Sequence, residues 1–164
     1  MTDIEFIGIA ATQEVSETTG PNQVDGIAAQ TEAGSPVGAV VNPHYVEALA
    51  RAHEGSGFDR VLIAHTSAMP DGLVVADQIL NRTERLGVLL AHRPGFLAPT
   101  LAARSYATLD AFHPGRVAMH VITGGDDVDQ QRDGDFADKT TRYARTDDFL
   151  TVVRQEWESG SIAS

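Results

Sequence analysis

The chain has 164 residues, of which 42% are hydrophobic, so it can form one folded domain with a core and is neither disordered nor fibrous. Its net charge of −11 repels phosphate groups, which argues against nucleic acid as a partner, and no apolar run reaches the ~18 residues of a membrane span. Cysteine is absent, which excludes disulfides and thiolate metal sites, and the acidic N-terminus lacks the basic flank of a signal peptide, so we expect a cytoplasmic protein.

The first part of the chain combines one strand, a long polar segment and one helix. Residues 4–10 are mostly apolar, which predicts a buried strand. Residues 11–42 show no periodicity and are interpreted as an irregular polar segment within a single domain that covers residues 1–164. Pro43, preceded by Asn42, predicts the start of a helix, because asparagine caps a first turn and proline fits its first position.

Three further strand–helix pairs follow in strict alternation. Apolar strands separated by amphipathic helices predict an α/β fold with a parallel sheet. Periodicity alone leaves two architectures open, a doubly wound sheet and part of a (β/α)8 barrel. The strands are predicted at 60–64, 86–91 and 116–122, and the helices at 70–80, 99–109 and 143–158.

The acidic stretch before the last helix, residues 126–141, is interpreted as a solvated loop. Its aspartates do not follow the spacing of a calcium-binding loop. The sequence also lacks the glycine-rich dinucleotide motif and the P-loop motif. We therefore predict no metal site and no nucleotide site of either of these types.

Four strings in the strand–helix region carry a resemblance to a known family. They contain Arg-Pro-Gly at 93–95 and Val-Ile-Thr-Gly-Gly at 121–125. From residue 43 on, the sequence resembles the bacterial luciferase-like flavin monooxygenases, and among them the FMNH2-dependent alkanesulfonate monooxygenases. The resemblance implies the N-terminal half, about four β/α units, of a TIM (β/α)8 barrel of the luciferase-like type. The strings lie at residues 45–64, 83–103, 107–125 and 133–154.

The resemblance also implies an activity. Reduced FMN, supplied by a separate NAD(P)H:FMN reductase, and O2 would act on an alkanesulfonate or related organosulfur compound and release sulfite and an aldehyde. In this family the later half of the barrel normally supplies the phosphate clamp for the flavin, in line with the general position of barrel phosphate sites. We expect a homo-oligomer, because two half-barrels can in principle close one another.

The active site of a barrel lies at the carboxyl ends of its strands, and this rule selects candidate residues. Gln13, His65 and Met69 follow the first two strands and are predicted to bind substrate. Met69 stands where the sulfonate enzymes often carry a cysteine, which leaves the substrate open. His92 and His120 are also the candidate catalytic residues. The predicted cofactor-binding residues are Ala91, His92, His120, Thr123, Gly124 and Tyr143.

Each of these candidates also has a purely structural interpretation. Neighbouring residues of a strand point to opposite faces, so His92 is predicted to face the barrel interior while Arg93 holds the Arg-Pro-Gly turn. Gly124 is explained as well by a tight turn. Tyr143, with its neighbour Arg142, is explained as well by packing at the start of the last helix.

Two other functions remain open. The first keeps the fold and replaces the flavin with a deazaflavin in an oxidoreductase of the same superfamily. The second is a half-barrel without catalytic activity that only associates with itself, because parallel strands at open sheet edges favour association.

Overall fold

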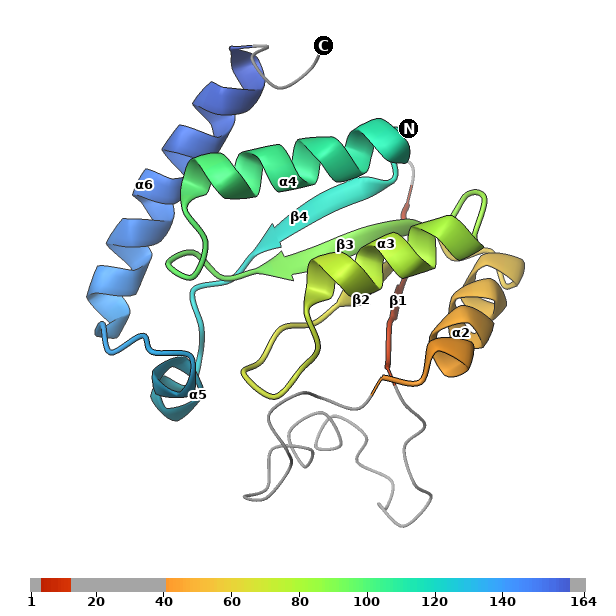
Figure 1. Cartoon of the computed structure of the whole chain (residues 1–164), viewed down its shortest axis with the longest axis horizontal. Helices are drawn as coiled ribbons and strands as arrows, with labels where there is room; N and C mark the ends of the chain where they lie inside the picture. Colours follow the sequence, from red (N-terminus) through yellow and green to blue (C-terminus); the bar gives the residue numbers. More distant parts are fainter. Residues whose placement is uncertain (1–3, 13–40, 160–164) are drawn as a thin grey trace.

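In the part of the chain that the structure describes, four strands alternate with helices, as expected. The computed structural model describes residues 4–12 and 41–159 (Figure 1). Most of the polar segment predicted at 11–42 therefore lies outside the described residues. The elements are β1 (Ile7–Ile9), α2 (Pro43–Gly55), β2 (Arg60–Ile63), α3 (Gly72–Arg82), β3 (Gly87–His92), α4 (Pro99–Phe112), β4 (Val117–Val121), α5 (Asp127–Arg132) and α6 (Lys139–Glu158).

The strands form one sheet in the order β1-β2-β3-β4, and every neighbouring pair is parallel. This confirms the predicted α/β fold. Because the order in the sheet follows the order in the chain, each crossover advances by one strand, as it does around a barrel. The register aligns two rows across all four strands. The first row is Gly8, Val61, Val88 and Val117, and the second is Ile9, Leu62, Leu89 and Ala118.

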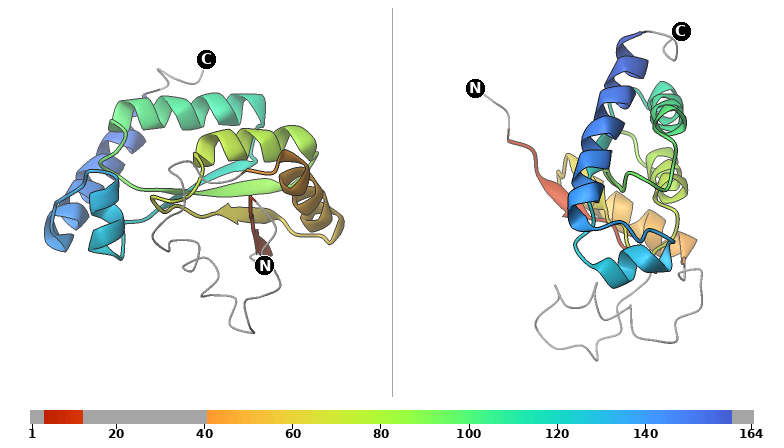
Figure 2. Two further views of the ribbon diagram at one scale, coloured as in Figure 1. Left: turned by 60° about the horizontal axis from the view of Figure 1, so that its bottom comes forward. Right: turned by 90° about the vertical axis from the view of Figure 1, so that its left-hand side faces the viewer.

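Helices α2, α3 and α4 cover one face of the sheet, and α6 packs against α4 (Figure 2). The first row faces these helices. Gly8 is buried there against α2, where a β-carbon would lie 2.3 Å from the His53 ring. Glycine therefore permits the close approach of α2 to the edge strand. The centre of the core is fully apolar and consists of Val61, Ile63, Val75, Ala76, Ile79, Leu80, Leu86, Val88 and Leu90.

The opposite face of the sheet carries no described helix. Ile7 and Ile9 point to this face and remain 45% and 52% exposed. The prediction that residues 4–10 form a buried strand is therefore wrong for these side chains. A run of apolar residues indicates a strand covered on both faces, but here the described residues cover only one.

The start of α2 follows the predicted cap. The side chain of Asn42 accepts hydrogen bonds from the backbone N–H groups of His44 and Tyr45, and Pro43 occupies the first turn of α2. Asp71 caps α3 in the same way. The largest departure lies between β4 and α6, where the stretch interpreted as a loop contains α5 and the first turn of α6. None of the described helices is long and apolar enough to cross a membrane.

The amino ends of the strands are held by two charged side chains that bind backbone groups. Glu54, near the end of α2, accepts hydrogen bonds from the N–H groups of Glu84, Arg85 and Leu86 at 2.9, 2.6 and 3.0 Å. Partial burial alone would raise the pKa of Glu54, but these three donors outweigh it and lower the pKa. The Arg116 guanidinium donates to carbonyl oxygens of Leu80 and Leu86 and to the Thr83 hydroxyl. These contacts join α2, α3, β3 and β4.

We expect Glu54→Gln to lower the free energy of unfolding by about 1–3 kcal/mol, because the neutral amide is a weaker acceptor for three N–H groups. The pKa of Glu54 is lower in the folded protein than the ordinary value of 4.5. The ionised carboxylate therefore contributes to the free energy of unfolding above about pH 4.5, and this contribution is lost as the pH falls through the folded pKa. Urea unfolding at several pH values measures both effects. Glu84→Gln, in the same turn, is the control, and an equal loss in both variants would contradict the assignment.

Candidate functional site

The carboxyl ends of the four parallel strands meet at one edge of the sheet. The carboxyl ends of β3 and β4, with the segments that follow β2 and β4, carry most of the predicted site residues, and α5 contacts the loop after β2 and the end of β3. Among these segments the structure brings together the loop at residues 64–71, the end of β3 at His92 and Arg93, and α5. Gln13 lies outside the described residues.

Arg93 is the centre of this edge. Its side chain is only 2% exposed, and its guanidinium donates to the Asp129 carboxylate at 2.6 Å and to Asp133 at 3.4 Å. Asp129 also accepts from the backbone N–H and the hydroxyl of Ser67, at 2.9 and 2.6 Å. Partial burial raises the pKa of Asp129, but the bonds from Ser67 and Arg93 outweigh it and lower the pKa. One carboxylate thus joins β3 to the loop after β2.

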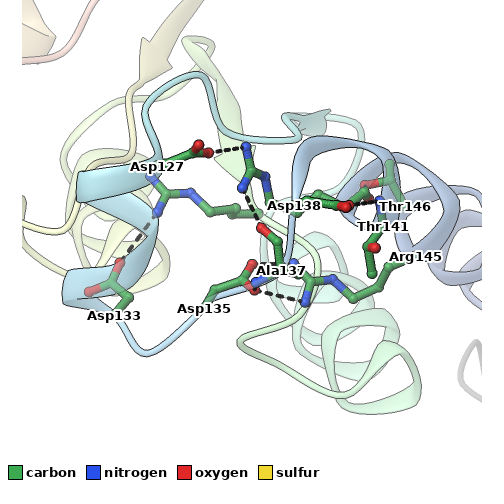
Figure 3. A network of polar contacts seen from close by, with 10 residues as sticks. Asp127, Asp133, Asp135, Ala137, Asp138, Thr141, Arg145 and Thr146 are labelled. Atoms are coloured by element: carbon green, nitrogen blue, oxygen red, sulfur yellow. Dashed lines mark hydrogen bonds and ion pairs between the residues drawn. The ribbon is translucent and has the colours of Figure 1, made fainter.

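Two further ion pairs hold α5 and the segment that follows it against the start of α6 (Figure 3). Arg142 is buried and donates to Asp127 at 2.7 Å and to the Ala137 carbonyl oxygen at 2.6 Å. Arg145 pairs with Asp135, which is itself buried. The interpretation of this acidic stretch as a loop is therefore wrong, because it contains α5 and arginines from elsewhere in the chain pair with Asp127, Asp129, Asp133 and Asp135, although the Asp127 side chain stays 69% exposed.

His92 departs from the predicted orientation. Its ring stacks on Phe149 of α6 at a centroid distance of 5.0 Å and meets the edge of Tyr106 of α4 at 5.7 Å. His92 therefore lies on the face that the helices cover, and the prediction that it points to the barrel interior is wrong. The alternation of β3 explains this, because His92 is two residues beyond Leu90, which is in the helix-covered core.

The two partly buried histidines at this edge, His65 and His92, favour the neutral form. Burial, with a smaller contribution from the charge of His65, lowers the pKa of His92 to about 4. Burial and the nearby Arg93 charge also lower the pKa of His65. The Nε2 atoms of both rings are buried and have no hydrogen-bond partner among the described residues. At neutral pH His92 is therefore an uncharged donor or acceptor.

Gly124 adopts a left-handed backbone conformation with φ of 81°, which explains the glycine in the turn after β4. Thr123, just before it, is partly buried. A β-carbon at Gly124 would lie 2.1 Å from the amide nitrogen of Gln130. The Gln130 side chain is 1% exposed, and neither of its amide atoms has a partner among the described residues. Gln130 thus occupies the space beside Gly124 that a bound cofactor was predicted to approach.

Of the remaining candidates, Ala91 and His120 adjoin each other, whereas Met69 and Tyr143 lie on other elements. Ala91 and His120 are partners in the β3–β4 register and lie on the face without helices, Ala91 buried and His120 exposed. Met69 is partly buried in the loop after β2. Tyr143 is 55% exposed at the start of α6, beside the buried Arg142. The packing interpretation is confirmed for Arg142, and the binding roles of the other residues remain predictions.

The sequence interpretation missed Asp129 and Gln130. Both belong to α5, which was not predicted as a helix. Asp126 was a signal in the sequence that could have predicted the start of α5, because its side chain caps this helix by accepting a hydrogen bond from the Val128 N–H. In the part of the chain that the structure describes, no three His, Asp or Glu side chains are grouped to hold a metal ion.

A family model described as luciferase-like monooxygenase matches residues 23–164. This match covers most of the chain, including every element from α2 to α6. The chain belongs to the luciferase-like monooxygenase family. The match confirms the resemblance seen in the sequence strings.

Solved structures show the same fold. EDTA monooxygenase from Chelativorans sp. BNC1 matches with a TM-score of 0.63 at 21% identity, over 71% of this chain and 31% of that protein. An F420-dependent secondary alcohol dehydrogenase matches with a TM-score of 0.62 at 22% identity, over 71% of this chain and 38% of that protein. DmoA from Hyphomicrobium sulfonivorans matches with a TM-score of 0.61 at 22% identity, over 71% of this chain and 30% of that protein. The chain thus spans about a third of each of these proteins, and its fold is part of a luciferase-like barrel.

We expect Asp129→Asn to lower the free energy of unfolding by about 2–4 kcal/mol, because it leaves the buried Arg93 guanidinium without its nearest carboxylate. Asp148→Asn, on the exposed side of α6, should change stability by less than about 0.5 kcal/mol. Urea unfolding followed by circular dichroism compares the two variants. A loss at Asp129 no larger than at Asp148 would show that the ion pair does not hold this edge together.

We expect Gly124→Ala to destabilise the fold by about 1–3 kcal/mol, because the new methyl group meets the Gln130 amide and the φ angle disfavours alanine. Gly125→Ala is the control, since no atom lies within 4 Å of a β-carbon there. The double variant Gly124→Ala/Gln130→Ala should lose about 1 kcal/mol less free energy of unfolding than the sum of the losses in the two single variants. Strict additivity would show that Gln130 does not fill this space.

Proposed function

We propose that the chain forms the flavin-facing half of a flavin-dependent monooxygenase that uses reduced FMN and O2. The family match supports this proposal, and so does the position of the uncovered sheet face. Ala91 and His120 lie on this face near the carboxyl ends of β3 and β4, where barrel enzymes carry their active sites.

The donor set at this position fits the ring system of a flavin. Leu62, Leu89 and Ala118 form an apolar row on the uncovered face, suited to pack against a planar aromatic ring and to exclude water from it. His120 is exposed next to Ala91, and its imidazole can donate a hydrogen bond to a ring carbonyl. The bound flavin would supply the oxygen chemistry, and these residues would bind and orient it.

The same edge fits the flavin phosphate poorly. The guanidinium groups of Arg93, Arg142 and Arg145 are engaged by carboxylates of α5 and the segment that follows it. Gln130 fills the space beside Gly124, so the backbone turn there is not free to receive an anion. We therefore assign the phosphate clamp to the part of the barrel beyond these four strands, after strands seven and eight.

For the substrate we propose an alkanesulfonate or a related organosulfur compound, converted to sulfite and an aldehyde. His65 and Met69 follow β2 at the active-site edge and are the residues assigned to it. Since burial lowers the pKa of His65, its ring would meet an anion as a neutral hydrogen-bond donor. Reduced FMN would come from a separate NAD(P)H:FMN reductase, and the reaction would take place in the cytoplasm.

A second candidate keeps the fold and replaces FMN with the deazaflavin F420. The structural likeness to an F420-dependent secondary alcohol dehydrogenase shows that a barrel of this shape serves that cofactor as well. Such a protein would be an oxidoreductase that does not use O2 as a substrate. The two candidates differ in which reduced cofactor the chain binds.

Anaerobic titration with reduced FMN, and in parallel with reduced F420, tests both candidates. We expect saturable binding of reduced FMN, and His120→Ala should weaken it about 3- to 10-fold through loss of one hydrogen bond. His44→Ala is the matched control, because His44 is exposed on α2. Tighter binding of F420 would favour the second candidate, and no binding of either cofactor would contradict both.

A further inference from the structure

The segment between β4 and α6, residues 126–137, is attached to the rest of the fold mainly through polar groups. Among the described residues, neither apolar core cluster contains a side chain from this segment. The side chains that the segment does bury, Gln130 and Asp135, are both polar. Burial of apolar surface, which holds the other helices on the sheet, therefore contributes little to holding this segment in place.

Ion pairs take the place of apolar contacts. Four pairs join three arginines of β3 and α6, or directly after them, to four aspartates of the segment (Figure 3). The pairs are Arg93–Asp129, Arg93–Asp133, Arg142–Asp127 and Arg145–Asp135. If the segment moves away, both members of each pair return to water, and their hydration replaces much of the attraction that is lost. An attachment of this kind can open while the apolar core stays folded.

Gln130 gives the closed arrangement an unfavourable contribution. It is the most deeply buried side chain of the segment, at 1% exposed, and it lies against Gly124. Neither its amide nitrogen nor its amide oxygen has a hydrogen-bond partner among the described residues. A buried amide without partners raises the free energy of the closed arrangement, and it regains hydrogen bonds when it reaches water.

The segment closes over the loop that follows β2. Asp129 accepts hydrogen bonds from the backbone N–H and the hydroxyl of Ser67 at 2.9 and 2.6 Å. His65 belongs to the same loop and lies close enough to Asp129 and Asp133 for both charges to affect its pKa. The Nε2 atom of His65 is buried without a partner, so a ligand reaches this atom only after the surrounding structure moves.

We propose that residues 126–137 form a lid, that this lid opens as a unit, and that it closes over a substrate bound at the loop after β2. Gly124 and Gly125 precede the lid and supply a hinge, because glycine accommodates large backbone rotations. Closure of such a segment excludes water from a reaction site, and reopening releases the product. The identity of the substrate, an alkanesulfonate, rests on the proposed function, whereas the opening of the lid does not.

The reaction rate of a buried thiol with iodoacetamide measures lid opening without any ligand. The chain has no cysteine, so each single variant carries one thiol. Gln130→Cys places it beneath the lid, and Ala76→Cys, in the core, is the matched control, because the original side chains are 1% and 0% exposed. After division by the rates in the urea-unfolded chains, the thiol of Gln130→Cys should react at least about a hundredfold faster.

Removal of single ion pairs tests whether the lid opens as a unit. In the Gln130→Cys chain, Asp127→Asn and Asp135→Asn each remove the partner of one arginine, on opposite sides of the thiol. Each should raise the rate of thiol reaction about tenfold, because the closed lid then buries an unpaired guanidinium. Asp148→Asn, on the exposed side of α6, should leave the rate unchanged.

Ligand dependence tests what the lid covers. In the presence of reduced FMN and without oxygen, hexanesulfonate should slow the reaction of the Gln130→Cys thiol at least about threefold, because a bound substrate favours the closed lid. Hexanol, which lacks the sulfonate group, is the control ligand and should not slow the reaction.

Equal rates for the Gln130→Cys and Ala76→Cys thiols would overturn the lid, because the segment would then open only when the whole fold unfolds. An effect of Asp127→Asn without one of Asp135→Asn would also overturn it, because α5 would then fray by itself. A lid that opens in a chain that binds reduced FMN, yet does not respond to hexanesulfonate, would overturn its closure over this substrate. A chain that binds no reduced FMN would instead contradict the proposed function, and the ligand-free rates would still decide whether the lid exists. Circular dichroism establishes that each variant is folded.

Discussion

The alternation of side chains along the four strands determines most of this structure. One residue in two faces α2, α3 and α4, and the next residue faces away from them. The row that contains Val61 and Val88 is buried under the helices, while the row that contains Ile9 and Leu62 is not. Since the register is the same across all four strands, this division runs over the whole sheet. Packing is confined to one face, and the residues available for binding are on the other.

The two ends of the sheet are stabilised differently. At the amino ends, Glu54 and Arg116 bind mainly backbone groups, and this pattern does not depend on which side chains occupy the neighbouring positions. At the carboxyl ends, Arg93 pairs with Asp129, and Arg142 pairs with Asp127, so the contacts require particular side chains. This difference agrees with the general barrel pattern, in which stability resides at the amino end and chemistry at the carboxyl end.

Local signals in the sequence predicted the elements well. Asn42 with Pro43 predicted the start of α2, because a cap acts within one turn and needs no distant partner. The order of strands and helices then led to the correct fold class. Residues 4–10 were assigned too much burial, because a strand sequence does not show whether both faces of its sheet are covered.

The candidate site was harder to predict, because its contacts join residues far apart in the chain. Arg93 and Asp129 are separated by 36 positions, and no local pattern links them. Without that pair, the aspartates of α5 are indistinguishable from those of a solvated loop. His92 was placed on the wrong face because the parity of β3 depends on which residue begins its covered row, and Leu90 revealed this only in the folded structure.

The ion pairs at the carboxyl edge also limit what this half of the barrel can bind. The arginines that pair with Asp127, Asp129 and Asp135 are not available to an anionic ligand. His92 carries no positive charge at neutral pH, because its pKa is lowered to about 4. What this edge offers a ligand is an apolar wall with His120 beside it. A planar uncharged ring suits such a surface, whereas a phosphate or sulfonate needs donors from elsewhere. The two halves of one barrel would therefore have different roles, with this half orienting the flavin ring and the other half binding the anionic groups.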